Sequence, residues 1–108
     1  MSKITTHVLD TARGMPAAGI TVTLRDADGA ILAQKQTDAD GRVKELGPEE
    51  LPAGVYALVF DTARYYELIE LDTFYPRVTI DFEIVHPDEH FHVPLLLGAF
   101  GYSTYRGS

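Results

Sequence analysis

The chain has 108 residues, of which 45% are hydrophobic and 23% are charged, and its formal net charge is −7. This length and composition predict one globular domain over residues 1–108, with a core of its own. The acidic balance argues against nucleic acid as a partner, because a nucleic-acid-binding domain carries a basic face. The absence of cysteine excludes a disulfide framework, a thiol nucleophile and a thiolate metal site.

The sequence also carries no sign of secretion or of membrane insertion. The stretch Met1–His7 has no apolar segment of the kind that marks a signal peptide. No run approaches the roughly 18 apolar residues that a membrane span requires. We therefore expect a cytoplasmic protein without membrane contact, either monomeric or homo-oligomeric.

Most of the chain alternates between apolar and polar residues with a period of two, which indicates β-strands. The expected strands are residues 5–9, 20–25, 30–37, 55–60, 78–84 and 91–97, with a final strand from about residue 102 onward. Asp28-Gly29 is a hairpin signal between two of these strands. Pro94 predicts an edge or bulge position for its strand, because proline cannot donate to the hydrogen-bond ladder.

One short helix is expected among these strands. Asp61 or Thr62 can cap its first turn, and residues 63–70 carry Tyr65, Leu68 and Ile69 at helical spacing. Seven or eight short strands at a spacing of roughly ten residues, with a single helix, predict a mainly β protein with a β-sandwich architecture.

Histidines are the candidate chemical groups of this chain, because an imidazole accepts protons near neutral pH. The sequence contains His7, His86, His90 and His92. His90 and His92 lie two residues apart in an expected strand and therefore point to the same face. Taken singly, a histidine is more often structural than functional.

Metal sites receive little support from the spacing of the candidate ligands. A His-x-His pair with a remote histidine can bind zinc, but here no carboxylate stands at a suitable spacing. Asp38–Gly41 resembles part of a calcium loop, yet Gln36 and Gly47 occupy positions where that loop needs Asp and Glu. We therefore expect no metal and no cofactor.

The segment 90–108 is unusual for the end of a sequence, because it is an apolar run followed by aromatic residues. Such a segment should pack against another part of the protein. Tyr105, Arg106 and Ser108 add a phenol, a guanidinium and a hydroxyl, which together could form one wall of a polar pocket. The alternative is a strand that merely closes a sheet.

Two stretches, Thr6–Ala17 and Tyr102–Ser108, resemble the transthyretin-related proteins, and within them the 5-hydroxyisourate hydrolases. The resemblance runs over essentially the whole chain. His7, His92 and the closing Tyr-Arg-Gly-Ser separate this pattern from the hormone carrier transthyretin. The carrier has a lysine and a threonine at the two histidine positions and lacks that ending.

The resemblance implies a prealbumin-like sandwich of two four-stranded sheets with one short helix. It further implies a homotetramer, a dimer of dimers, with active sites at the dimer–dimer interface. The catalytic residues would be His7, Arg42 and His92, and the substrate would be bound by His7, Arg42, Tyr105 and Ser108. We expect His86 and His90 at the surface, with the mouth of the channel as the alternative place for His90, because it shares the face of His92.

The activity that the resemblance implies is metal-independent hydrolysis of a cyclic amide bond of 5-hydroxyisourate. The product would be 2-oxo-4-hydroxy-4-carboxy-5-ureidoimidazoline, in the degradation of urate. The alternative is a transthyretin-like carrier that binds small aromatic ligands in the central channel.

Overall fold

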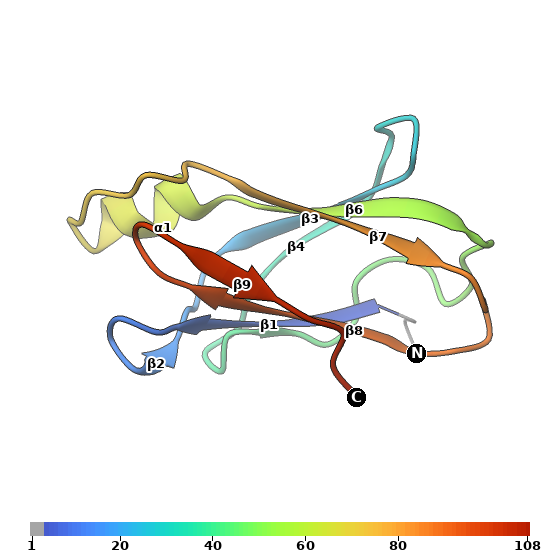
Figure 1. Ribbon diagram of the computed structural model, residues 1–108, viewed down its shortest axis with the longest axis horizontal. Coiled ribbons are helices and arrows are strands. Elements are labelled where there is room, and N and C mark those ends of the chain that lie inside the picture. Colours follow the sequence, from blue (N-terminus) through green and yellow to red (C-terminus); the bar gives the residue numbers. More distant parts are fainter. Residues whose placement is uncertain (1–3) are drawn as a thin grey trace.

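The computed structural model describes residues 4–108, which form two β-sheets and one short helix (Figure 1). The elements are β1 (Ile4–Asp10), β2 (Met15–Pro16), β3 (Thr21–Arg25), β4 (Ile31–Gln36), β5 (Arg42–Val43), β6 (Gly54–Phe60), α1 (Thr62–Leu68), β7 (Val78–Ile84), β8 (Phe91–Leu97) and β9 (Tyr102–Thr104). One sheet has the order β2-β1-β8-β9, with β5 paired to part of β1, and the other has the order β4-β3-β6-β7. The predicted mainly β sandwich with one short helix is confirmed.

The first sheet has five strands, because β5 adds a two-residue strand beside β1. Its register sets Val43 opposite Thr6 and Arg42 opposite His7. A two-residue strand is too short to produce an alternating pattern, so the sequence did not predict β5 or the equally short β2.

The hydrophobic core lies between the two sheets and follows the alternation of the strands. Val22 and Leu24 of β3 are fully buried, as are Val8 of β1 and Leu58 of β6. Along β1 buried and half-buried residues alternate, so one face of the strand packs on the core while the other faces outward. Burial of each such aliphatic side chain stabilises the fold by about 1.5–3 kcal/mol.

β8 lies inside its sheet, between β1 and β9, so the prediction of an edge or bulge position for Pro94 is wrong. The strand pairs in parallel with β1 along its whole length. On its other side β9 pairs with residues 95–97, and the next link is a bridge between His92 and Gly107. The ladder is therefore interrupted opposite Pro94, which has no N–H to donate, and this gap is how the sheet accommodates an internal proline.

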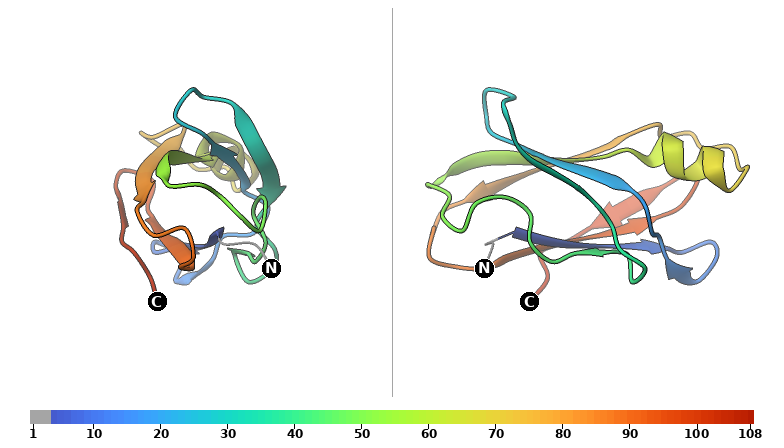
Figure 2. Two further views of the ribbon diagram at one scale, coloured as in Figure 1. Left: turned by 90° about the vertical axis from the view of Figure 1, so that its right-hand side faces the viewer. Right: turned by 180° about the vertical axis from the view of Figure 1, so that it is seen from behind.

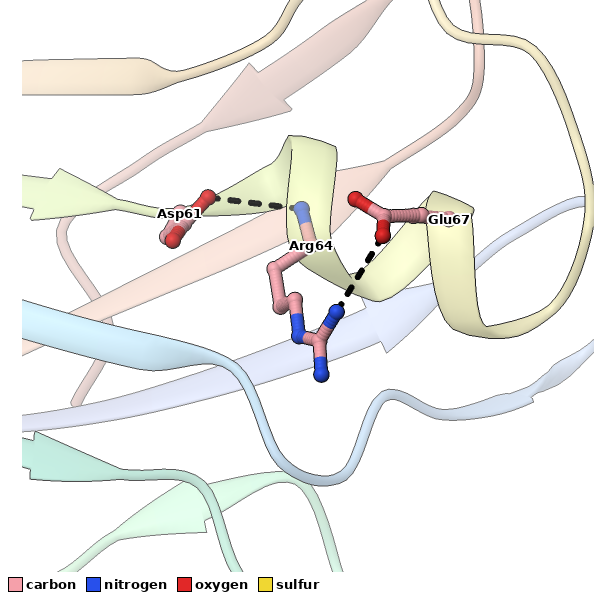
Figure 3. Close-up of polar contacts among 3 residues, drawn as sticks. All are labelled: Asp61, Arg64 and Glu67. Carbon is pink, nitrogen blue, oxygen red and sulfur yellow. Dashed lines mark hydrogen bonds and ion pairs between the residues drawn. The ribbon is translucent and has the colours of Figure 1, made fainter.

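α1 begins where Asp61 caps its first turn. The Asp61 carboxylate accepts a hydrogen bond from the backbone N–H of Arg64 at 3.3 Å, and the Arg64 side chain pairs with Glu67 at 3.2 Å on the exposed side (Figure 3). The cap satisfies one of the free amides of the first turn. The predicted cap at Asp61 is thus confirmed.

The buried side of α1 is anchored by an aromatic residue. The Tyr65 hydroxyl donates to Oδ2 of Asp10, at the end of β1, at 2.6 Å. Burial, followed by the Asp10 carboxylate, raises the pKa of Tyr65 to about 12. Tyr66 is also buried, whereas Leu68, expected on the apolar face, is 62% exposed.

The sheets end in β7 and β9 on the same side of the sandwich, as the end-on view in Figure 2 shows. Within residues 4–108 neither strand has a neighbour beyond it in its sheet, so their outer backbone edges are open. Over the same residues, no helix is long and apolar enough to cross a membrane.

Candidate active site

Three strands bring polar side chains together on the outer face of the first sheet. The alternation of β1 turns Thr5 and His7 to this face. The parallel register sets His92 of β8 beside Thr5, and the antiparallel register sets Arg42 of β5 beside His7. Directly paired residues project to the same face, so His7, Arg42 and His92 share it.

A cavity of about 360 Å³ opens on this face. It is lined by Thr5, Thr6, Arg42, Val43, Lys44, His90, His92 and Ser108. Two of these side chains are cations, although the chain as a whole has a net charge of −7. The lining therefore gives a locally positive site that suits an electron-rich polar ligand.

The residues expected at the site from the sequence do not all lie in this cavity. Arg42, His92 and Ser108 line it. His7 lies next to Arg42 but outside the lining of the cavity. Tyr105, which is 58% exposed, lines a different cavity of about 250 Å³ between β7, β8 and the segment after β9.

His7 is held by a backbone carbonyl. Its Nε2 lies 2.9 Å from the carbonyl oxygen of Asp40, in the turn before β5. A carbonyl oxygen only accepts hydrogen bonds, so Nε2 of His7 carries a proton. In the neutral ring Nδ1 is then unprotonated and can accept a proton.

His92 is held from two sides. Its Nδ1 lies 2.8 Å from the hydroxyl of Thr5. Its Cδ2 edge faces Gly107, where an added Cβ would lie only 2.5 Å from Cδ2. The remaining nitrogen, Nε2, is the one left to act on a molecule in the cavity.

The surroundings of His92 favour its neutral form. Burial lowers the pKa of His92 from its ordinary value of 6.5, and the positive charge of Arg42 lowers it further. His7 and His90 act in the same direction, whereas a hydrogen bond with the Thr5 backbone raises the pKa and only partly offsets these effects. A neutral imidazole is the form that accepts a proton from water.

The segment after β9 is fastened to β8, in keeping with the expectation that it packs. The backbone N–H of Gly107 donates to the carbonyl of His92 at 2.8 Å. The Arg106 guanidinium lies 4.8 Å from the centre of the Phe91 ring and pairs with Glu89 at 3.7 Å. These contacts bring Gly107 against His92 and Ser108 to the cavity.

The sequence did not point to Thr5 or Lys44, and it left His90 between the surface and the mouth of the channel, whereas the structure places all three in the lining of the cavity. Thr5 and His7, like His90 and His92, lie two residues apart, and this spacing was the available signal. Only the pairing of β1 with β8, however, shows that the two pairs meet. Among residues 4–108, no group of three or more His, Cys, Asp or Glu side chains is arranged to hold a metal ion.

Comparison with known proteins agrees with the resemblance seen in the sequence. The model of the HIUase/Transthyretin family matches residues 4–107. The chain belongs to this family. Its relatives include proteins named 5-hydroxyisourate hydrolase and proteins named transthyretin.

Within the HIUase/Transthyretin family the chain is more similar in sequence to the hydrolases. It is 46% identical to the 5-hydroxyisourate hydrolase of Salmonella dublin, covering 97% of this chain and 80% of that protein. The structure of Klebsiella pneumoniae 5-hydroxyisourate hydrolase has a TM-score of 0.90 at 41% identity, covering 100% of this chain and 94% of that one. Sea bream transthyretin, solved in complex with thyroxine, has a TM-score of 0.89 at 31% identity, covering 97% of this chain and 94% of that one.

Proposed function

We propose that this protein is a 5-hydroxyisourate hydrolase, which opens a cyclic amide bond of 5-hydroxyisourate with water to give 2-oxo-4-hydroxy-4-carboxy-5-ureidoimidazoline. The observation that carries the proposal is the pair of imidazoles, each with one nitrogen engaged, beside an arginine on a single open face. A carrier has no need of proton acceptors at its ligand. The identity to the hydrolases, at 46% and 41%, against 31% to the transthyretin, supports the same choice.

In the proposed reaction His7 and His92 hold the attacking water and accept its proton. Nδ1 of His7 and Nε2 of His92 are the nitrogens that their protein contacts leave available. A positioned base of this kind accelerates a reaction by about 10²–10⁴-fold. The water oxygen attacks the carbonyl carbon of the ring as this proton leaves, and the ring C–N bond then breaks as its nitrogen takes up a proton from solvent.

Arg42 stabilises the negative charge that develops on the carbonyl oxygen. Its planar guanidinium presents paired N–H donors that match a flat, oxygen-rich heterocycle. Donors aimed at the developing oxyanion contribute more in the transition state than in the ground state, and therefore raise the rate. Lys44 lines the same cavity and adds to the positive potential.

The segment after β9 completes the binding site in this proposal. Ser108 lines the cavity and fixes the ligand through hydrogen bonds. Tyr105 lies at a neighbouring cavity of the same chain. It orients the substrate only if a second subunit brings its ring to this site.

The proposal includes a cytoplasmic homotetramer, a dimer of dimers with active sites at the dimer–dimer interface. Two features support this assembly. The open edges of β7 and β9 lie on one side of the sandwich, where a second copy can add its own edges. The site lies on an outer sheet face, which a facing dimer would close against water.

The test is a direct assay with the untagged protein. Urate and urate oxidase generate 5-hydroxyisourate in the cuvette, and its ultraviolet absorbance is followed with and without this protein. We expect strong acceleration over spontaneous decay, and the same rate after treatment with a chelator. No acceleration by folded protein would contradict the proposal and favour a carrier, and loss of the rate with chelator would contradict its metal independence.

A further inference from the structure

Thr5 places a single hydroxyl between two imidazole rings. Its Oγ1 lies 2.8 Å from Nδ1 of His92 and 3.0 Å from Nε2 of His90. Both separations are within hydrogen-bond distance. The reaction described above gives neither Thr5 nor His90 a task, although both line the cavity.

The hydroxyl couples the protonation of the two rings. A threonine hydroxyl has one proton, so it donates to one ring and must accept from the other if both bonds form. If Nδ1 of His92 donates to Thr5, then Thr5 donates to Nε2 of His90. If Thr5 instead donates to Nδ1 of His92, then Nε2 of His90 must carry a proton and donate it to Thr5.

The geometry of His92 favours the first arrangement for a hydrolase. Nε2 is the nitrogen left for the cavity, and it accepts a proton from water only when the neutral ring carries its proton on Nδ1. Thr5 stabilises this tautomer by accepting from Nδ1. The arrangement parallels serine hydrolases, where a hydrogen-bond acceptor at Nδ1 of the histidine holds the tautomer that catalysis requires.

Resting on the proposed function, we propose that Thr5 and His90 are positioning residues that form a proton relay with His92. Thr5 accepts the Nδ1–H of His92, so that Nε2 enters the cavity unprotonated. During the reaction Thr5 passes a proton onward to His90, at the outer end of the relay.

The relay balances at every atom. As the oxygen of water forms its bond to the carbonyl carbon, the π pair of the C=O bond moves onto the carbonyl oxygen, where Arg42 stabilises the negative charge. One O–H bond of the water breaks at the same time, and its proton bonds to Nε2 of His92. The Nδ1–H bond of His92 breaks and that proton bonds to Oγ1 of Thr5, whose own proton moves to Nε2 of His90. His90 is left as an imidazolium, while His92 and Thr5 end neutral.

Electrostatics gives the relay its direction. His92 is half-buried beside Arg42, so a positive charge on its ring is opposed by burial and by the guanidinium. His90 is exposed to solvent and can release its proton there. The charged or titratable groups around the relay are His7, Arg42, Lys44, Glu89 and Arg106.

The first test compares two substitutions at Thr5. Thr5→Ser keeps the hydroxyl, and we expect its kcat to stay within about threefold of the unsubstituted protein. Thr5→Val keeps the branched shape without the hydroxyl, and we expect kcat to fall roughly 10- to 1000-fold, with KM nearly unchanged. Thr79→Val, on the outer face of the other sheet, is the matched control and should have normal kcat.

Two outcomes at Thr5 would overturn the relay. One is normal kcat in folded Thr5→Val protein. The other is an equal loss in Thr5→Ser and Thr5→Val, because a structural role would not be rescued by the hydroxyl alone. Circular dichroism confirms the fold of each variant before the assay.

The second test addresses the outer end of the relay. Glutamine at residue 90 can hydrogen-bond to Thr5 but cannot be protonated, so we expect His90→Gln to lower kcat by roughly tenfold or more. Added imidazole buffer should restore part of this loss, because the relay ends in solvent. His86→Gln is the control, and normal kcat in His90→Gln would exclude His90 from the relay.

The third test needs no substrate and is therefore independent of the proposed function. ¹⁵N chemical shifts of the His92 ring report which nitrogen carries the proton at about pH 8, above its lowered pKa. We expect the proton on Nδ1 in the unsubstituted protein and a mixture of tautomers in Thr5→Val. A proton fixed on Nε2 in the unsubstituted protein would overturn the relay, whereas absence of hydrolysis with the expected tautomer would overturn only the function.

Discussion

At the scale of single residues, the two site histidines differ in which nitrogen the protein engages. A backbone carbonyl fixes Nε2 of His7, and a side-chain hydroxyl holds Nδ1 of His92. A carbonyl oxygen only accepts hydrogen bonds, so the ring nitrogen beside it must carry the proton. A hydroxyl can donate or accept, so the ring nitrogen beside it can be protonated or unprotonated. His7 is therefore set in one tautomer, and the tautomer of His92 depends on Thr5.

Removal of either imidazole should abolish most of the activity. We expect His7→Ala and His92→Ala each to reduce kcat by about 10²–10⁴-fold, the usual contribution of a proton-transfer group. His86→Ala removes an exposed histidine from the turn between β7 and β8 and should be without effect. Steady-state kinetics on 5-hydroxyisourate provides the comparison, and normal rates in both site variants would rule out the mechanism.

The lowered pKa of His92 predicts the pH dependence of the reaction. The neutral ring is the active form, so kcat/KM should decline only as pH falls through the lowered pKa, at a pH below 6.5. Between that pKa and 6.5 the unfolded chain binds more protons than the folded chain, so the same shift makes stability decrease as pH falls. A kcat/KM profile with its acid limb above pH 6.5 would contradict this assignment.

At the scale of elements, the segment after β9 acts as a clamp on β8. Gly107 bonds to the backbone of His92 and packs on its ring, and Arg106 stacks on Phe91. The His92 ring occupies the space that a side chain at residue 107 would need. Glycine is therefore required there by close approach to the ring and not by an unusual backbone angle.

Gly107→Ala should damage activity more than stability. The new Cβ would lie 2.5 Å from Cδ2 of His92, so the ring must turn away from the cavity. A displacement of about 1 Å in a catalytic group can cost on the order of 10²-fold in rate. Gly101→Ala is the control, because a Cβ there meets nothing within 4 Å. Equal kcat for the two variants would show that the clamp does not position His92.

The contact between α1 and β1 lies at the other end of β1 from Thr5 and should affect stability alone. Tyr65→Phe removes a buried donor from the Asp10 carboxylate, which should lower the free energy of unfolding by about 1–3 kcal/mol. Urea unfolding measures this loss, and Tyr102→Phe, with its more exposed ring, is the control. A large loss of kcat in folded Tyr65→Phe would show that this end of β1 communicates with the site.

Much of the fold was predictable because strand alternation and turn residues are local signals. The strand 78–84, the strand 91–97 and the cap at Asp61 were predicted from their neighbours in sequence. The side-by-side pairing of β1 and β8 was not predictable from local pattern, because it joins segments more than eighty residues apart. The position of Pro94 and the meeting of Thr5 with His90 depend on that pairing, and both were missed.

At the scale of the whole molecule, the open edges of β7 and β9 and the open site face favour association. If the proposed tetramer forms, sedimentation at micromolar concentration should give four times the mass of one chain. Dilution should reduce kcat/KM as the tetramer dissociates, because the site face would lose its cover. Full activity in a species with the mass of a single chain would contradict an interfacial active site.

The parallel pairing of β1 with β8 also has a consequence for the order of folding. Thr5 and His92 are separated by 87 positions in the sequence, and nearly every other element lies between them. During synthesis, the backbone groups of β1 that pair with β8 therefore have no strand partner until β8 has been made. Contacts between residues so far apart in sequence also form slowly. The strands of the other sheet all lie between Thr21 and Ile84, so that sheet can form before β8 has been made. The proposed catalytic face is thus completed only after β8 has been synthesised, and a nascent chain that has not reached β8 lacks the proposed site.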